Sequence, residues 1–280
     1  MVSFLRLGLL CISLLAVPAA SPAGEFHRTN LDAPAPGSGS VRLADLARVL
    51  APDLRKDGDA WRAFRLEETL AADLGLDSEW PEGLSLTQAI LAEPDHGTRL
   101  AVLFDLGAAS GDPATPALLA LYRTGDTPEL LGVLDVGLDR ETGLDADALQ
   151  PLGDGADLIT VRNGHFNSEQ SYSLSTLLLA TADGLEVIDD IATFSETFCG
   201  LRRTQEPRIT VERATGVDPA PIRVEFLLRD EVVEGSCEEE TPALPERKIG
   251  VTYRWDAAAA RYEPDSQALE DLAAENEKSF

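Results

Sequence analysis

The sequence predicts an α+β protein that is mainly β: an antiparallel meander or sandwich, with a short N-terminal helical region and a C-terminal helix. Three observations lead to this prediction. Apolar residues recur in strand-length runs from residue 99 onward, turn residues separate these runs, and helical spacing is confined to the two ends. Hydrophobic residues make up 44% of the chain, which is enough to build a packed core despite the charge.

The N-terminus has the pattern of a secretory signal peptide. Arg6 precedes the apolar run Leu7–Ala20, and small residues that suit a signal peptidase follow. The apolar run is too short to cross about 30 Å of hydrocarbon. We therefore expect residues 1–23 to be cleaved, the chain to reach the periplasm or the outside medium, and the mature protein not to insert into a membrane.

The next two segments are predicted to be a linker and a helical region. Residues 24–40 are rich in Ala, Pro, Gly and Ser, as flexible linkers are. Residues 41–97 carry helical spacing, although Trp61–Arg65 also fits a strand. The expected helices are Val41–Leu50, Asp59–Leu74 and Ser85–Ala92. We expect this region to cover one face or edge of the sheet.

Residues 98–264 are predicted to form the mainly antiparallel β domain. The expected strands are Leu100–Leu106, Ala117–Arg123, Leu130–Val136, Asp157–Val161, Tyr172–Thr181, Leu185–Phe194, Arg208–Arg213, Ile222–Arg229, Ile249–Trp255 and Arg261–Glu263. Turn residues at 124–128 and 183–184 predict two β-hairpins. The two hairpins resemble each other, either because a three-stranded unit is repeated or by chance.

The C-terminal segment 265–280 is predicted to be a helix. Asp265 or Ser266 is the expected N-cap, and Leu269 and Leu272 fall on one side. We expect this helix to pack weakly.

Two cysteines remain after cleavage, Cys199 and Cys237. In an oxidising compartment they are expected to form a disulfide, which the chain-entropy model values at about 4 kcal/mol. Two free buried thiols or a reactive cysteine are the alternatives, although neither residue lies in a CxxC motif or beside a histidine.

The charge of −26 argues against nucleic acid and anionic lipid as partners, because binding a polyanion needs a basic patch. The acidic residues are scattered along the chain, which favours a solubility surface over a site for a cationic partner or calcium. Lysine occurs only at Lys56, Lys248 and Lys278, and this preference for arginine is typical of GC-rich bacteria.

The densest group of hydrogen-bonding side chains lies in residues 162–172 and is the candidate binding loop. Its candidate residues are Asn163, His165, Asn167, Ser168, Glu169 and Tyr172. Ordinary turn chemistry would also produce such a segment. In a hydrolase, His165 would be the general base, Glu169 or Asp157 its partner, and Ser168 or Ser171 the nucleophile. The chain has no G-x-S-x-G, S-x-x-K or H-E-x-x-H motif.

We expect no metal or other cofactor. The three histidines are too scattered for a zinc site. Residues 139–147 alternate acidic side chains around Gly143, but an EF-hand would need glycine one position later and Glu in place of Gln150. We interpret this stretch as a solvated loop, with a calcium-stabilised β module as the alternative.

Aromatic residues alternate with charged ones near the C-terminus. Tyr253, Trp255 and Tyr262 fit either cross-strand packing, which we favour, or a carbohydrate-binding face. Taken together, the sequence predicts an exported, acidic bacterial protein of the periplasm or cell envelope. Its role is expected to be binding or structural, with an unknown protein or small-molecule partner. The alternatives are a hydrolase centred on His165 and the calcium-stabilised module.

Overall fold

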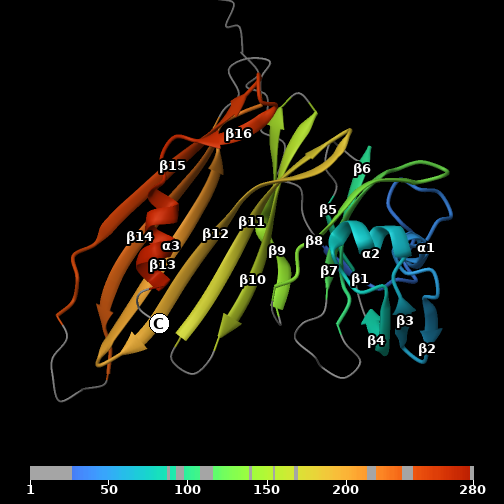
Figure 1. Ribbon diagram of the computed structural model, residues 1–280, viewed down its shortest axis with the longest axis horizontal. Coiled ribbons are helices and arrows are strands. Elements are labelled where there is room, and N and C mark those ends of the chain that lie inside the picture. The colour runs from blue at the N-terminus through green and yellow to red at the C-terminus, as the bar shows by residue number, and fades with distance from the viewer. Residues whose placement is uncertain are drawn as a thin grey trace, which may run out of the picture.

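The computed structural model describes residues 27–86, 89–92, 98–107, 116–138, 141–153, 155–166, 170–212, 219–234 and 242–277. Within these ranges the chain is mostly antiparallel β-sheet with a few short helices (Figure 1). The predicted α+β, mainly β class and the C-terminal helix are confirmed. The predicted signal peptide lies outside the described residues.

The first of three antiparallel sheets in the described chain, here called the N-terminal sheet, has the strand order β1-β5-β6-β7-β8. Its strands are β1 (His27–Thr29), β5 (Ala89–Ala92), β6 (Arg99–Asp105), β7 (Ala117–Arg123) and β8 (Glu129–Asp135). A small sheet joins β2 (Arg55–Asp57), β3 (Ala60–Arg65) and β4 (Glu79–Leu86). Two helices accompany them, α1 (Leu43–Leu50) and α2 (Glu68–Leu74).

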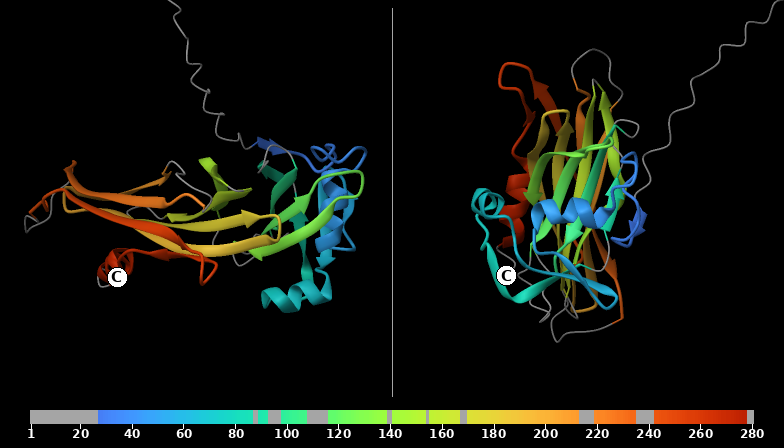
Figure 2. Two further views of the ribbon diagram at one scale, coloured as in Figure 1. Left: turned by 90° about the horizontal axis from the view of Figure 1, so that it is seen from above. Right: turned by 90° about the vertical axis from the view of Figure 1, so that its right-hand side faces the viewer.

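The third sheet, here called the meander sheet, pairs eight strands in their order along the chain. They are β9 (Glu141–Gly153), β10 (Ala156–Phe166), β11 (Gln170–Thr181), β12 (Gly184–Phe198), β13 (Leu201–Val211), β14 (Ile222–Val232), β15 (Arg247–Asp256) and β16 (Arg261–Pro264). The helix α3 (Ala268–Asn276) follows. Figure 2 shows the N-terminal elements gathered at one end and the meander sheet extending away from them.

The N-terminal sheet is buried on both faces. On one face, Val102, Phe104 and their neighbours pack against α1 and the small sheet. The Tyr122 hydroxyl on β7 donates to the Leu46 carbonyl of α1 at 3.1 Å. On the other face, Leu103 and Leu119 belong to a core shared with β9, β10 and β11. This second core joins the two large sheets.

A buried ion pair also joins these two sheets. Arg99 Nη2 on β6 lies 3.0 Å from Asp157 Oδ2 on β10, and the two side chains are 4% and 8% exposed. The same nitrogen donates to the Gly155 carbonyl at 2.6 Å, whereas Nε and Nη1 of Arg99 are buried without a hydrogen bond. The junction therefore contains a buried, charge-assisted contact inside an apolar interface.

The meander sheet forks between β12 and β13. These strands pair only between residues 196–198 and 201–203. Beyond the fork, glutamine side chains accept hydrogen bonds from strand amides: Gln205 Oε1 from Phe194, and Gln150 Oε1 from Val211, each at 3.1 Å. Past this point, apolar residues of β10–β12 pack against those of β14–β16 and Leu272 of α3.

The predicted linker is wrong for the part that the structure describes. In residues 27–40, Leu31 is 0% exposed and Ala35 is 3% exposed, and β1 pairs with β5. Backbone hydrogen bonds tie the segment to α1, with Ala44 donating to the Leu31 carbonyl at 2.9 Å. The small side chains allow tight turns that pack against the core. A composition rich in Ala, Pro, Gly and Ser is therefore not sufficient to identify a flexible linker here.

The predicted helical region of residues 41–97 is only partly helical. Helix α1 confirms the helix predicted over Val41–Leu50, and α2 confirms the end of the helix predicted over Asp59–Leu74. Residues Ala60–Arg65 instead form strand β3, in agreement with the alternative stated for this segment. The predicted helix over Ser85–Ala92 is wrong, because β4 ends at Leu86 and Ala89–Ala92 is β5. A short apolar run fits both helical and strand spacing, and the pairing of Ala89–Ala92 with β6 makes this run a strand. Because β1 and β5 share a sheet with β6–β8, the expected boundary at residue 97 cuts through one sheet.

Nearly all of the strands predicted after residue 98 are confirmed, with shifts at their ends, but one strand was missed. Residues 141–153 form β9 at the edge of the meander sheet, where the prediction had a solvated loop. The segment is acidic and contains Pro151, and both features suit an edge strand better than a central one.

The predicted N-cap of the C-terminal helix is wrong. The N-cap is Gln267, and Asp265 instead accepts a hydrogen bond from the Thr252 amide at 2.9 Å. Leu272 is the one fully buried residue of α3. Cys199 lies in the turn between β12 and β13 with a positive φ of 47°, whereas Cys237 lies outside the described residues, so their pairing stays a prediction.

The two predicted hairpins are confirmed, as β7–β8 and β11–β12, and they meet at a close backbone contact. A Cβ placed on Gly184 would lie 3.2 Å from the Leu131 carbonyl oxygen of β8, and Gly184 has a φ of +145°. Gly125, in the β7–β8 turn, has a similar φ of +148° but open space around it.

Alanine substitutions at Gly125 and Gly184 separate the cost of backbone strain from the cost of steric crowding. We expect Gly125→Ala to lower the free energy of unfolding by about 1 kcal/mol through strain alone. Gly184→Ala should cost about 1–3 kcal/mol more, because the new methyl group also meets rigid backbone. Urea unfolding of both variants measures the difference, and equal losses would mean that the contact between β8 and the β11–β12 turn is not tight.

Candidate functional site

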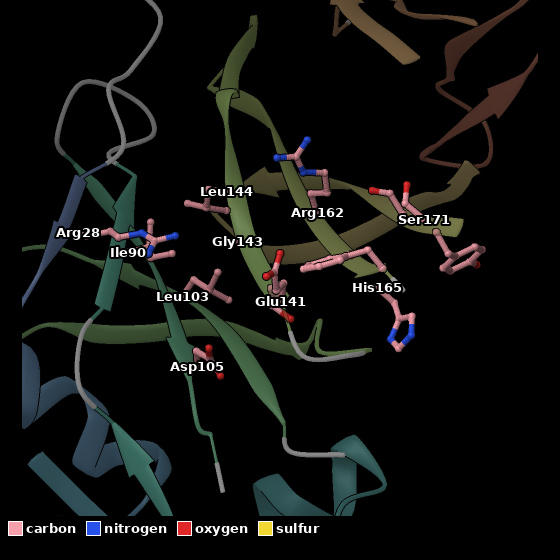
Figure 3. A pocket seen from close by; sticks show the side chains of 15 residues that line it. Arg28, Ile90, Leu103, Asp105, Glu141, Gly143, Leu144, Arg162, His165 and Ser171 are labelled. Atoms are coloured by element: carbon pink, nitrogen blue, oxygen red, sulfur yellow. The ribbon is translucent and has the colours of Figure 1, made fainter. Parts of the chain in front are cut away.

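A cleft of about 580 Å³ opens between the N-terminal sheet and the first strands of the meander sheet (Figure 3). Strands β1, β5 and β6 form one wall, and β9, β10 and β11 form the other. Ile90, Leu103 and Leu144 supply apolar lining. The volume falls within the range of about 300–1,000 Å³ that is typical of ligand sites.

Strand register divides the lining of β9 and β10 between the two faces of the sheet, because Leu144 and His165 alternate with the glycine that precedes each of them. On β10, Gly164 lies opposite Glu141 of β9 and Ser173 of β11, and Arg162 lies opposite Gly143. Since side chains alternate along a strand, Glu141, Gly143, Arg162 and Gly164 project from the same face. One edge of the meander sheet therefore carries charged groups beside two positions without side chains.

The charged groups of the cleft are balanced in sign. Arg28 and Arg162 face a lining that also holds Asp105 and Glu141. Partial burial raises the pKa of Asp105, while the nearby Arg28 and the Gly107 amide counteract that rise. Burial and the negative charges of Asp190 and Glu277 raise the pKa of Tyr172, so its hydroxyl keeps its proton at neutral pH.

The structure brings together only part of the predicted binding loop. His165 and Tyr172 lie opposite each other on β10 and β11 and line the cleft. Asn167, Ser168 and Glu169 lie outside the described residues. Sequence reasoning missed Arg28, which fell in the presumed linker, and Asp105, which lay within the strand predicted over Leu100–Leu106. Neither had a local signal, since the cleft forms only when two distant segments pack.

Asn163 has a structural position, 2% exposed and outside the cleft lining. Its Oδ1 accepts from the Leu138 amide at 3.1 Å and from the Thr142 hydroxyl at 2.6 Å. Its Nδ2 donates to the Val136 carbonyl at 2.8 Å. Asn163 thus fixes the crossover from β8 to β9, which connects the two sheets.

The hydrolase hypothesis loses one of its proposed partners. Asp157 and His165 both lie on β10, and eight residues at about 3.3 Å each separate them by roughly 26 Å. Asp157 is instead ion-paired with Arg99. Asp157 therefore cannot orient His165 as a catalytic base, and the other proposed partner, Glu169, lies outside the described residues.

The stretch proposed for calcium is strand β9 from residue 141 onward, and residues 139 and 140 lie outside the described residues. Residues 141–144 pair with β10 instead of curling around a cation. Across the described part of the chain, no group of three or more His, Cys, Asp or Glu side chains is arranged to hold a metal ion.

The aromatic hairpin near the C-terminus is packed, as favoured, and does not form a carbohydrate-binding face. Tyr253 and Tyr262 are 1% and 6% exposed. The Tyr253 hydroxyl donates to Asp189, and the Tyr262 hydroxyl donates to the Ala220 carbonyl at 2.8 Å. Trp255 meets Tyr262 edge to face, with ring centroids 5.5 Å apart.

A second cavity of about 400 Å³ lies at the fork of the meander sheet, beside the end of α3. Its charged side chains pair with one another: Arg203 with Asp230 at 2.9 Å, and Arg247 with Glu275 at 2.7 Å. Gln205 and Asn276 exchange two amide hydrogen bonds there. These groups already satisfy each other, so the inter-sheet cleft is the stronger candidate site.

Comparison of the chain with protein-family models, curated proteins and solved structures finds no match. Among the described residues, no helix has the length and apolar character needed to cross a bilayer.

Proposed function

We propose that this chain is an exported, non-catalytic binding protein of the bacterial periplasm or cell envelope, and that the inter-sheet cleft is its binding site. The composition and shape of the cleft are the main support for this proposal. It gathers side chains from residues 28 to 173, on six strands, into one open site with an apolar part and converging polar groups. Such a combination is the usual form of a small-molecule site.

Binding is favoured over catalysis by the surroundings of His165. Its side chain is exposed, and of its two proposed partners Asp157 is engaged elsewhere. The cleft offers groups for recognition without a described constellation for bond breaking.

Blocking the cleft tests this proposal. A Cβ placed on Gly143 meets nothing within 4 Å, and its φ lies outside the left-handed region, so Gly143→Trp should fold and fill the cleft with an indole. We expect native mass spectrometry to find a small molecule bound to the wild-type chain after incubation in periplasmic extract. Gly143→Trp should lose it.

Arg208→Trp is the matched control, because Arg208 is exposed on β13, away from the cleft. This variant should retain the bound molecule. Absence of any bound molecule on the wild type, or its retention by Gly143→Trp, would contradict the proposed site. Thermal unfolding of all three proteins confirms that they are folded.

A further inference from the structure

We infer that the ligand of the cleft is a neutral saccharide; the inference rests on the proposed function and specifies its ligand. A sugar presents hydroxyl groups that both donate and accept hydrogen bonds, around carbon faces that are apolar. The cleft complements both kinds of surface. Its polar lining, its exposed aromatic ring and its two open glycines each support this inference separately.

The polar lining offers donors and acceptors in balance. The guanidinium groups of Arg28 and Arg162 donate, and the carboxylates of Asp105 and Glu141 accept. The hydroxyl groups of Ser171 and Tyr172 can do either, whereas those of Thr142 and Ser173 already donate to Asn163 and can only accept from a ligand. An anionic ligand would meet both carboxylates and a cationic one both guanidinium groups, whereas a neutral polyol can use all four charged groups.

Phe166 gives the cleft an apolar aromatic surface. It ends the described part of β10 and remains 67% exposed, although large apolar side chains on β10 such as Leu158 and Ile159 are fully buried. Phenylalanine has no polar atom to satisfy, so its exposure leaves a ring face available to a partner. The carbon face of a sugar ring is flat and apolar enough to stack on it.

Gly143 and Gly164 make the backbone accessible within the same lining. Placing a Cβ on either residue meets no atom within 4 Å, and neither has the positive φ that would require glycine. Glycine inside a strand weakens it, and often marks a place where another molecule approaches the backbone. A flat ring lying against these positions would reach both the Glu141 and Arg162 side chains.

Calorimetric titration with neutral di- to hexasaccharides of glucose, mannose, galactose and N-acetylglucosamine tests the inference. Zwitterionic dipeptides and inorganic phosphate are titrated in parallel. We expect at least one saccharide series to bind, with an affinity that changes little between low and high NaCl, since no net charge is neutralised. Gly143→Trp should abolish this binding.

Variants of Phe166 distinguish stacking from general apolar contact. Phe166→Trp should retain saccharide binding, whereas Phe166→Leu should weaken it about tenfold. Equal affinity in Phe166→Leu and wild type would overturn the stacking geometry, and with it the inference. Binding of dipeptide or phosphate without any saccharide would overturn it too, while leaving the proposed site intact. If no saccharide binds and periplasmic extract also yields no bound molecule, the proposed function itself fails.

Discussion

Replacing Arg99 with methionine is expected to lower the free energy of unfolding by about 3–5 kcal/mol, because the buried Asp157 carboxylate would lose its guanidinium partner. The Asp157 side chain is 8% exposed, and Arg99 Nη2 lies 3.0 Å from its carboxylate. The substitution should weaken the junction between the two large sheets, since the ion pair connects β6 to β10. Urea unfolding measures it directly.

Two further variants make this expectation specific. Arg223→Met removes an exposed pair with Glu225, whose side chains are 48% and 44% exposed, and should cost less than about 1 kcal/mol. The double variant Arg99→Met with Asp157→Leu should regain most of the stability, because Nε and Nη1 of Arg99 already lack partners in the wild type. A double variant no more stable than Arg99→Met would mean that the contact with Gly155, and not the buried charge, controls the junction.

Asn163→Ala is expected to lower the free energy of unfolding by about 3 kcal/mol. The substitution removes three hydrogen bonds and leaves the Leu138 amide and the Val136 carbonyl without their partner, at about 1 kcal/mol each. Thr142→Val removes one of the three and should cost about 1 kcal/mol. Urea unfolding compares the two.

The same variant decides between two roles for Asn163. The sequence predicted a ligand contact, whereas the structure places its amide in the β8–β9 crossover. If Asn163→Ala kept wild-type stability but lost the bound small molecule, the contact role would be correct. If stability falls and the folded fraction still binds, the residue has the architectural role described above.

Local pattern was enough to predict most of the described strands after residue 98. Strands such as β7 and β14 are apolar runs between clear turns, and their pairing partners lie next to them along the chain. The pattern was insufficient where pairing is distant. The strand β5 is short and apolar, and only its contacts with β1 and β6 show that it is not helical.

The candidate site was predictable only in part, for the same reason. His165 and Tyr172 stand in a polar segment that drew attention, and they face each other across one hairpin. Arg28 and Asp105 join them through packing of the second core, which no local spacing encodes. Asn163 shows the converse: a polar residue in a polar segment can be buried by hydrogen bonds to a distant crossover.

The sequential order of the meander sheet has a consequence for how the chain folds. Each of its strands pairs with the strand that emerged just before it, so the sheet can grow hairpin by hairpin with little loop-closure entropy at each step. The N-terminal sheet differs, because β1 must wait for β5, about sixty residues later. We therefore expect β1, and with it the wall of the cleft that carries Arg28, to dock after the other strands of its sheet have formed.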